Sequence, residues 1–330
     1  MSASSKALVT GAAGFIGSNL CDYLLEKNLQ VIGIDNFSTG QKEFLQKSER
    51  SSCFRLHESD LSNLDQIKGI FLDEKPDIVF HLAANADVRF GLEYPRRDLE
   101  QGTIVTHNVL EAARTAGVKK FAYSSTGSVY GEPNVFPTPE DCPFPIQTSL
   151  YAASKLAGEA MIQAYAEGFG MQGFIFRFVS ILGPRYTHGH VFDFIQKLKL
   201  DPSQLEVLGD GKQKKAYLHI EDCLNAIWTV INKADQKINI YNLGPDEFST
   251  VNDSLDTIES ILGVSPIRKY SGGERGWVGD SPFIFLDCSK LKSLGWESTY
   301  SIQDGVKATA KFLLDNPQLI ITGQNKDLAK

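Results

Sequence analysis

The chain has 330 residues, of which 42% are hydrophobic and 22% are charged, and its formal net charge is -7. This length suits one large domain or two joined domains, and the negative charge argues against nucleic acid or an anionic membrane surface as a partner. No apolar run reaches the roughly 20 residues that a membrane-spanning helix needs.

The cysteines and the N-terminal residues indicate the cellular setting. The five cysteines form neither a Cys-x-x-Cys motif nor a cluster with histidine, which argues against a metal site. Residues 1–6 lead straight into an apolar run and lack the charged and apolar regions of a signal peptide. We therefore expect a cytoplasmic protein with reduced thiols and no bound metal.

Short apolar runs alternate with helical patterns through the first half of the chain. This alternation is typical of βαβ units and predicts an α/β protein whose parallel sheet is covered by helices on both faces. We expect strands at residues 6–10, 30–35, 53–56, 77–82, 120–124 and 174–178, and helices ending at 27 and spanning 63–73, 96–117 and 151–168.

From about residue 180 the elements become shorter and mixed. We place a domain boundary there, with a first domain at 1–180 and a smaller mixed α/β substrate domain at 181–330, some of whose elements pack back onto the first sheet. Residues 131–148 carry five prolines and are expected to form an ordered loop. We expect strands at 205–208, 215–220 and 238–242, and helices at 191–199, 221–233, 251–262 and 302–315.

Three glycines, Gly11, Gly14 and Gly17, form a GxxGxxG motif between the first strand and the first helix. Gly11 permits a tight turn, Gly14 lets backbone approach a pyrophosphate, and Gly17 permits close helix–sheet contact. Asp35 lies 18 residues beyond Gly17, where a strand-end carboxylate binds a ribose diol and repels a 2′-phosphate. Glycine-rich turns are common, and Asp35 taken alone is an ordinary turn residue. Strand, loop, helix and acid in this order predict a Rossmann-type doubly wound sheet that binds NAD rather than NADP.

His81 closes the fourth predicted strand and is followed by Leu82, Ala83 and Ala84. Small residues at this position leave room for a flat cofactor at the carboxyl ends of the strands. A histidine at the end of a buried strand is more often a hydrogen-bonded structural group than a catalytic one, so we assign His81 no part in the chemistry.

Tyr151 and Lys155 stand four residues apart in a predicted helix, so their side chains share one face. A phenol has a pKa near ~10 in water, and a fixed ammonium beside it favours the phenolate. The hydroxyl of Thr126, at the end of the fifth predicted strand, can share a proton with the same substrate oxygen. Such Tyr-x-x-x-Lys pairs also arise by chance, so the pair gains its meaning from the motifs around it.

Together these motifs resemble the extended short-chain dehydrogenase/reductase family. Within that family the chain is similar to the nucleotide-sugar epimerases, with the UDP-glucose 4-epimerases as the nearest type. The stretches that carry the resemblance cover nearly the whole chain: residues 11–17, 60–61, 81–84, 124–126, 129–131, 151–155, 183–185, 209–213, 217–222, 241–244, 279–280 and 287–290.

The resemblance implies a role for each matching residue. Tyr151 is the base, Lys155 binds the nicotinamide ribose and acidifies Tyr151, and Thr126 is the hydroxyl partner. The residues implied to bind NAD, besides Tyr151 and Lys155, are Gly11, Ala13, Gly14, Phe15, Ile16, Gly17, Asp35, Asn36, Ser38, Thr39, Gly40, Asp60, Leu61, Leu82, Ala83, Ala84, Ser124, Ser125 and Val179. The residues implied to bind the sugar nucleotide are Thr126, Ser180, Val191, Lys215, Tyr217, Arg275 and Asp280, with Lys215 and Arg275 on the diphosphate.

Three positions depart from the family pattern. Gly102 replaces an asparagine, so that a polar contact near the cofactor ribose is lost or is supplied by Gln101. Ser180 replaces an asparagine, and Lys215 replaces an arginine, which keeps the charge but loses the planar fork. These changes bear on the sugar and the nucleotide and leave the redox residues intact.

The residues after Thr126 discriminate among the reactions of this family. Dehydratases carry Asp-Glu there and decarboxylases usually keep the Glu, whereas this chain has Gly127 and Ser128, which are no general acids or bases at neutral pH. We therefore predict NAD-dependent epimerisation, at C4 of a UDP-hexose such as glucose, galactose or their N-acetyl or uronic acid forms, through a 4-keto intermediate. A net reductase stays open. A non-catalytic NAD-binding protein is a further alternative, against which the intact catalytic residues argue.

The resemblance also implies a homodimer that pairs the helix at 96–117 and the Tyr151 helix of each subunit. Apolar residues on these helices serve either that interface or the core of one chain: Val109, Ala112, Ala113, Met161 and Tyr165.

Overall fold

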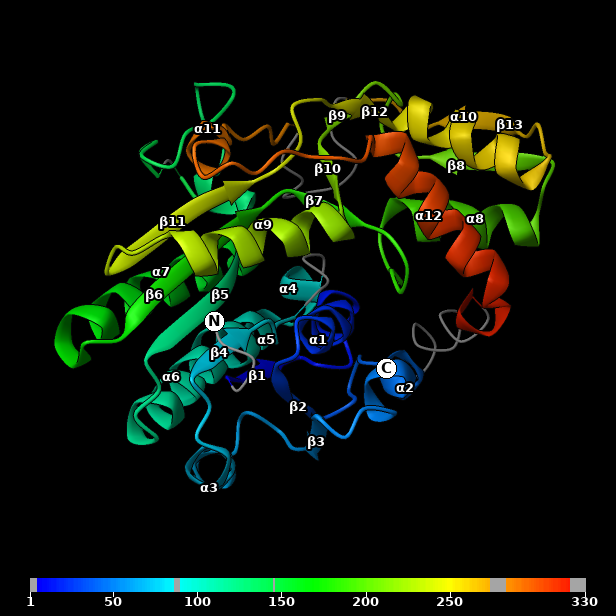
Figure 1. Ribbon diagram of the computed structural model, residues 1–330. Helices are drawn as coiled ribbons and strands as arrows, with labels where there is room; N and C mark the ends of the chain where they lie inside the picture. Colours follow the sequence, from blue (N-terminus) through cyan, green and yellow to red (C-terminus); the bar gives the residue numbers. More distant parts are fainter. Residues whose placement is uncertain (1–4, 86–89, 145, 274–282, 321–330) are drawn as a thin grey trace.

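A seven-stranded parallel sheet with helices on both faces dominates the computed structural model, which describes residues 5–85, 90–144, 146–273 and 283–320 (Figure 1). The strand order is β11-β6-β5-β4-β1-β2-β3, and every neighbouring pair is parallel. This confirms the predicted fold class. The strands are β1 (Lys6–Thr10), β2 (Gln30–Asp35), β3 (Phe54–Glu58), β4 (Ile78–His81), β5 (Lys120–Thr126), β6 (Gln172–Phe178) and β11 (Ile238–Leu243).

Alternate side chains of each strand supply the two faces of the sheet, because successive residues point to opposite sides. In β1, Ala7 and Val9 join one buried cluster, with helices α1 (Phe15–Glu26) and α9 (Ile220–Lys233). Leu8 joins the other, with α3 (Leu64–Glu74), α6 (Val105–Thr115) and α7 (Leu150–Phe169). Burial on both faces explains why these strands are continuous apolar runs.

The helix expected at 96–117 is interrupted. After α4 (Phe90–Glu93) and α5 (Pro95–Asp98), a π-helical segment, η2 (Leu99–Ile104), precedes α6. The Thr106 hydroxyl, in the first turn of α6, donates to the Gly102 carbonyl of this segment at 2.5 Å. A Cβ at Gly102 would lie 2.7 Å from Ser154 Cβ of α7, so the wider turn brings bare backbone against that helix. The prediction of one regular helix was wrong here because periodicity does not register a single inserted residue.

The smaller part of the molecule packs around α8 (His190–Leu200), α10 (Val251–Leu262) and α12 (Ile302–Asp315) (Figure 1). Three strands in this part were not expected, because segments of two to four residues carry no readable pattern. The strand pairs are β7 (Ser180–Leu182) with β10 (Tyr217–His219), β8 (Gln204–Val207) with β13 (Ile267–Tyr270), and β9 (Lys214–Lys215) with β12 (Ser249–Thr250). The remaining short helices are η1 (Lys42–Leu45), α2 (Gln46–Glu49), η3 (Gly127–Tyr130) and α11 (Ser289–Lys292).

Strand β11 and helix α9 follow residue 180 in the chain but belong to the main sheet and its helix layer. The predicted boundary at residue 180 stays a proposal about domain organisation. The loop at residues 131–148 lies against the segment that contains Phe285 and Asp287. The Thr138 backbone nitrogen donates to the Phe285 carbonyl at 2.8 Å, and the Asp287 nitrogen donates to the Thr138 carbonyl at 2.9 Å.

Of the apolar residues that were assigned either to an interface or to the core, three lie in the core of the single chain and two are partly buried beside it. Val109, Ala112 and Ala113 are fully buried, and Met161 and Tyr165 pack against the same cluster. Within the described ranges, no helix is long and apolar enough to cross a membrane.

Candidate active site

A cavity of about 1030 Å³ lies at the carboxyl ends of the strands, between the main sheet and the smaller part. Residues that follow β1, β2, β3, β4, β5 and β6 all line it. This is the edge of a doubly wound sheet at which ligands bind, because the carboxyl ends of parallel strands meet there.

The glycine loop forms the floor of this cavity. Gly11 has φ +69°, a left-handed conformation that favours glycine, and a Cβ there would lie 2.9 Å from the Ala83 backbone nitrogen. A Cβ on Gly17 would collide with the Gly11 carbonyl oxygen, so this position admits no side chain. Helix α1 starts directly after Gly14, whose lack of a capping side chain leaves the helix N-terminus open to a phosphate.

Asp35 joins the end of β2 to the glycine loop. Its carboxylate accepts hydrogen bonds from the backbone nitrogens of Ala13 at 2.9 Å and Phe37 at 2.8 Å. Burial raises the pKa of Asp35, and these hydrogen bonds oppose the shift. A Cβ on Gly40 would lie 2.8 Å from Asp35 Oδ1, so bare backbone faces the acid. A fixed carboxylate beside a cradle without side chains fits the ribose diol of NAD and repels a 2′-phosphate.

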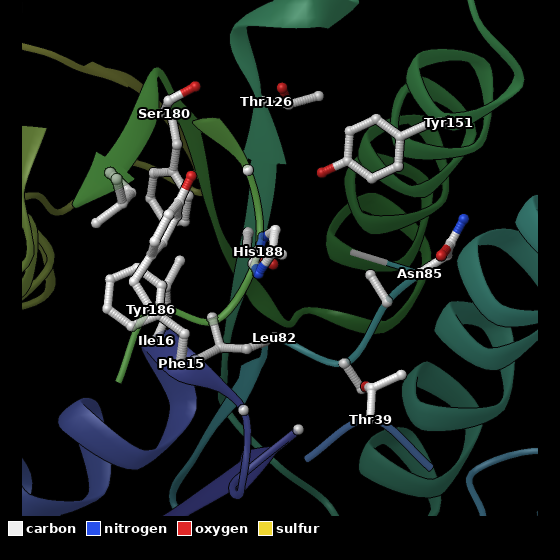
Figure 2. Close-up of a pocket in the computed structure, with 18 of the residues that line it drawn as sticks. Phe15, Ile16, Thr39, Leu82, Asn85, Thr126, Tyr151, Ser180, Tyr186 and His188 are labelled. Carbon is white, nitrogen blue, oxygen red and sulfur yellow. The ribbon is translucent and has the colours of Figure 1, made fainter. Parts of the chain in front are cut away.

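Tyr151, Lys155 and Thr126 lie on one wall of the cavity. The Ser149 hydroxyl caps α7 by accepting from the Ala152 nitrogen at 3.1 Å, which places Tyr151 in the first turn. Figure 2 shows the Tyr151 ring reaching from α7 into the cavity, with its hydroxyl directed toward the centre and Thr126 nearby at the end of β5. The sheet and the helix therefore bring together three residues, of which the first and the last, Thr126 and Lys155, are 29 positions apart in the sequence.

Lys155 is 2% exposed, and its ammonium contacts the strand end instead of the phenol. The Nζ donates to the Ser124 carbonyl at 2.6 Å and lies 4.7 Å from the Tyr123 ring centroid and 5.8 Å from the Tyr151 ring centroid. Burial lowers the pKa of Lys155 to about 7, against the opposing effect of Glu159 and Asp98.

The expected lowering of the Tyr151 pKa by Lys155 is not found in the protein alone. Burial raises the pKa of Tyr151 to about 12, and the nearby Asp98 carboxylate adds to the rise. The reason is that desolvation disfavours the phenolate more than the ammonium, held against Ser124, stabilises it.

A buried ion pair supports this wall from behind. Arg177 of β6 donates to Glu159 of α7 at 3.0 and 2.7 Å, and both side chains are almost fully buried. The Ser125 hydroxyl also donates to Glu159, and Arg177 donates to the Tyr130 hydroxyl at 2.7 Å. Glu159 stands one turn beyond Lys155, so the helix face that carries Tyr151 and Lys155 is fixed to the strand ends.

His81 is fully buried between Thr10 Oγ1 at 2.7 Å and Thr106 Oγ1 at 3.1 Å. Burial lowers its pKa to about 3, so the ring is neutral at physiological pH. These contacts agree with its interpretation as a structural group.

Most of the predicted binding residues line the cavity. Ala13 is fully buried and does not line the cavity, but its backbone nitrogen donates to the Asp35 carboxylate. Val191 is fully buried in the core of the smaller part and does not face the cavity. Arg275 and Asp280 lie outside the described residues. Those that line the cavity are Gly11, Gly14, Phe15, Ile16, Gly17, Asp35, Asn36, Ser38, Thr39, Gly40, Asp60, Leu61, Leu82, Ala83, Ala84, Ser124, Ser125, Thr126, Tyr151, Lys155, Val179, Ser180, Lys215 and Tyr217.

The wall formed by β9, β10, the loop after β7 and the start of α8 contains residues that the sequence analysis did not predict. His190 lines the cavity beside Val191, and its ring stacks on Tyr217 at 4.6 Å between centroids. His188 stacks on Tyr186 at 5.1 Å. No motif marks these residues, which lie in the loop after β7 and at the start of α8, because their place depends on how that loop packs over α1. Other lining residues that were not assigned to a ligand include Asn85, Gln101, Ser128, Gln213 and Ile284.

Gly127 lacks an acid, and it also shapes the cavity next to the end of β5. A Cβ at this position would lie 2.7 Å from Ile284 Cγ2, so the glycine lets Ile284 approach the strand end. The Ser128 hydroxyl lies 3.2 Å from Thr126 Oγ1, within a hydrogen-bonded turn.

A parallel sheet whose glycine loop, buried strand-end acid and Tyr–Lys pair share one cavity defines a dinucleotide-dependent hydride-transfer protein. The model of the NAD dependent epimerase/dehydratase family matches residues 7–244. The chain belongs to this family, which agrees with the prediction of NAD as the cofactor.

Individual relatives extend over nearly the whole chain. A putative UDP-glucose 4-epimerase of Methanocaldococcus jannaschii is 31% identical and covers 94% of this chain and 98% of its own length. The crystal structure of a UDP-glucose 4-epimerase with UDP-glucose from Thermotoga maritima is 32% identical, with a TM-score of 0.83 over 94% of this chain and 99% of that one. A UDP-glucuronic acid 4-epimerase from Bacillus cereus, in complex with UDP-glucuronic acid and NAD, is 31% identical with a TM-score of 0.85 and the same coverage.

Proposed function

We propose that the protein is an NAD-dependent 4-epimerase of a UDP-hexose, with UDP-glucose and UDP-galactose as the first substrates to test. The observation that carries this proposal is the pairing of an intact Thr126, Tyr151 and Lys155 wall with Gly127 and Ser128, which supply no acid or base for elimination. The relatives named above, which act on UDP-sugars at C4, support the same reaction.

The chain's own residues bind the substrate and move one proton. NAD, when bound, supplies the hydride acceptor and donor and the positive charge of its nicotinamide ring. Tyr151 removes the proton from the C4 hydroxyl as a 4-keto sugar forms, and it returns that proton to the oxygen when C4 is reduced on its other face. Thr126 donates a hydrogen bond to the same oxygen, and Lys155 binds the ribose next to the nicotinamide.

The binding roles follow the two sides of the cavity. We assign the ADP half of NAD to the glycine loop, to residues 35–40 and to Asp60 and Leu61, the central part to residues 82–84, and the nicotinamide to Val179. Ser180, Lys215 and Tyr217 face the sugar nucleotide, with Arg275 and Asp280 as further proposed contacts. The first domain, 1–180, thus binds NAD and the second, 181–330, binds the substrate.

A neutral hexose fits the sugar end best. The residues that we place beside the sugar besides Tyr151 are Thr126, Ser128, Ser180 and Ile284, and none of them is a cation. A uronate carboxylate would rely on hydroxyl and backbone donors, which stabilise a buried charge less than a cation does.

We also infer a cytoplasmic homodimer. Apolar side chains remain exposed along the two helical segments that the family resemblance assigns to the interface: Leu99 at 51%, Ile104 at 44%, Leu150 at 46% and Phe169 at 57%. Sedimentation equilibrium of the purified protein tests this inference, and a monomer at micromolar concentration contradicts it.

The function is tested by incubating the protein with UDP-, GDP-, CDP- and dTDP-sugars, without added reductant, and resolving the products by chromatography. We expect interconversion of UDP-glucose and UDP-galactose at constant total sugar nucleotide. Conversion of a GDP- or CDP-sugar with every UDP-sugar inert overturns the nucleotide assignment. Stoichiometric consumption of NADH identifies a reductase, and tight NAD binding with no reaction on any sugar nucleotide identifies a non-catalytic protein.

A further inference from the structure

Asn85 and Asp98 form a buried pair next to the catalytic wall. Asn85 follows β4 in the loop that continues from residues 82–84, is 7% exposed and lines the cavity. Asp98 ends α5 and is 2% exposed. Asn85 Nδ2 donates to Asp98 Oδ1 at 3.0 Å. Figure 2 shows Asn85 on the same side of the cavity as Tyr151, toward Thr39.

The carboxylate of Asp98 is unusual for a structural group. Its Oδ2 is buried and has no hydrogen-bond partner within the described part of the chain. A buried carboxylate costs folding free energy unless it is fully paired, and here a neutral amide is its hydrogen-bonding partner. The contact that this carboxylate does make fixes the orientation of the Asn85 amide, with the nitrogen toward Asp98 and the oxygen directed away from it.

Asn85 can be compared with two neighbouring positions, Gly102 and Gln101, that could also present an amide to the cavity. At Gly102 any side chain is blocked, because its Cβ would lie 2.7 Å from Ser154 Cβ. Gln101 also lines the cavity, but its side chain is exposed, and within the described part of the chain no hydrogen bond holds it. Asn85 is therefore the preorganised amide on this wall, since its partner is fixed before any ligand arrives.

Asp98 lies next to the start of α7, because a Cβ on Gly91 would collide with Asp98 Oδ2 and would lie 3.7 Å from Leu150 Cβ, and Leu150 precedes Tyr151. Asp98 acts on both Tyr151 and Lys155, raising the pKa of each. Burial raises the pKa of Asp98 itself, while Asn85, Arg97 and Lys155 lower it. Glu159 also faces Lys155 and raises its pKa more than Asp98 does, although Glu159 is paired with Arg177.

We propose that Asn85 is a cofactor-binding residue whose side-chain oxygen accepts a hydrogen bond from the ribose next to the nicotinamide of NAD, and that Asp98 is the positioning residue that orients it. This rests on the proposed function only in placing the nicotinamide at Tyr151. The pair also keeps a negative charge beside Lys155, which favours the ammonium form in a fully buried site.

The test is a double-mutant cycle on NAD affinity, measured by titrating NAD into the apoprotein without any sugar nucleotide. We expect Asn85→Ala to weaken NAD binding about tenfold, the effect of one hydrogen bond to a fixed group. Asp98→Ala should weaken it by about the same factor, and the double variant should again lose about tenfold because the two residues act as one unit. Gln101→Ala, the matched control on the same wall, should change the affinity less than about twofold.

Unchanged NAD affinity in Asn85→Ala, or a tenfold loss in Gln101→Ala, overturns the assignment. Losses that multiply to about a hundredfold in the double variant show that Asp98 does not act through Asn85. If the wild-type protein binds no NAD, the proposed function fails as well, whereas wild-type binding without an effect of Asn85→Ala defeats this inference alone.

The isosteric Asp98→Asn covers the case in which Asp98→Ala does not fold, because it keeps the shape and an acceptor oxygen and removes the charge. NAD affinity should stay within about twofold. Removing the negative charge lowers the pKa of both Tyr151 and Lys155, so both limbs of the pH profile of turnover should move to lower pH. Limbs that stay in place show that the Asp98 charge does not act on the catalytic pair.

Discussion

The two walls of the cavity differ in how they are built. The cofactor-facing wall follows from parallel strands in register, whose ends place the glycine loop, Asp35 and Thr126 along one edge of the sheet. The wall that we assign to the substrate combines a two-residue strand, a three-residue strand, a loop and the first residue of α8, and contributes His188, His190, Lys215 and Tyr217. Backbone pairing determines the shape of the wall at the strand ends, and side-chain packing determines the shape of the other wall. Substrate selection can therefore change while the cofactor site stays the same.

Changing Tyr151, the proposed base, should have the largest effect. Tyr151→Phe removes the group that we propose moves the C4 proton, so we expect turnover to fall by about 10²–10⁴ while bound NAD is retained. Product chromatography and the NAD content of the purified variant measure the two effects. Tyr165→Phe, on the same helix and bonded to Glu111, is the control. Full activity of Tyr151→Phe would remove it from the mechanism.

The ion pair behind the cofactor-facing wall should dominate stability. Arg177→Met leaves Glu159 buried without its partner, and breaking such a pair costs about 3–5 kcal/mol. Urea unfolding of the variant measures this change in the free energy of unfolding. The double variant Glu159→Gln with Arg177→Met should recover part of the loss. Arg114→Met, at the surface pair with Glu111, is the matched control and should have little effect.

Lys215 tests the substrate-facing wall on its own. Lys215→Ala removes a cation from the proposed diphosphate contact, so KM for the UDP-sugar should rise about 10–100-fold, as for a hydrogen bond to a charged group. NAD affinity should not change, because Lys215 lies on the opposite wall. Lys215→Arg should keep KM near the wild-type value. An equal loss of NAD affinity in Lys215→Ala would show that the two walls are not independent.

Asp35 gives the converse test on the cofactor-facing wall. Asp35→Asn removes the charge that faces the proposed ribose diol, and we expect NAD affinity to fall about tenfold, the weakest of these four effects. Discrimination against NADP should relax, because the repulsion of a 2′-phosphate is lost. Parallel titrations of NAD and NADP measure this. If the preference for NAD over NADP does not change, the Asp35 carboxylate serves only to accept hydrogen bonds from Ala13 and Phe37.

The difference between the walls also explains which predictions from sequence were accurate. Strands 6–10, 30–35 and 120–124 were found within two residues of their ends, since buried parallel strands read as apolar runs. The single helix predicted at 96–117 was not found, because the π-helical segment at residues 99–104 does not change the periodicity of the apolar residues. Val191 was assigned to the ligand, but helical geometry turns it into the core and presents His190 instead.

By itself, the sequence determined the sheet, the glycine loop, Asp35 and the Tyr151–Lys155 spacing. Each of these depends on local periodicity, on glycine conformation or on a distance of one helical turn. Only the tertiary structure decided which way Lys155 points, why Gly102 carries no side chain, and that Asn85 meets Asp98. Those outcomes depend on contacts between elements far apart in the chain, where burial and neighbouring charges set the conformation and the pKa of each group.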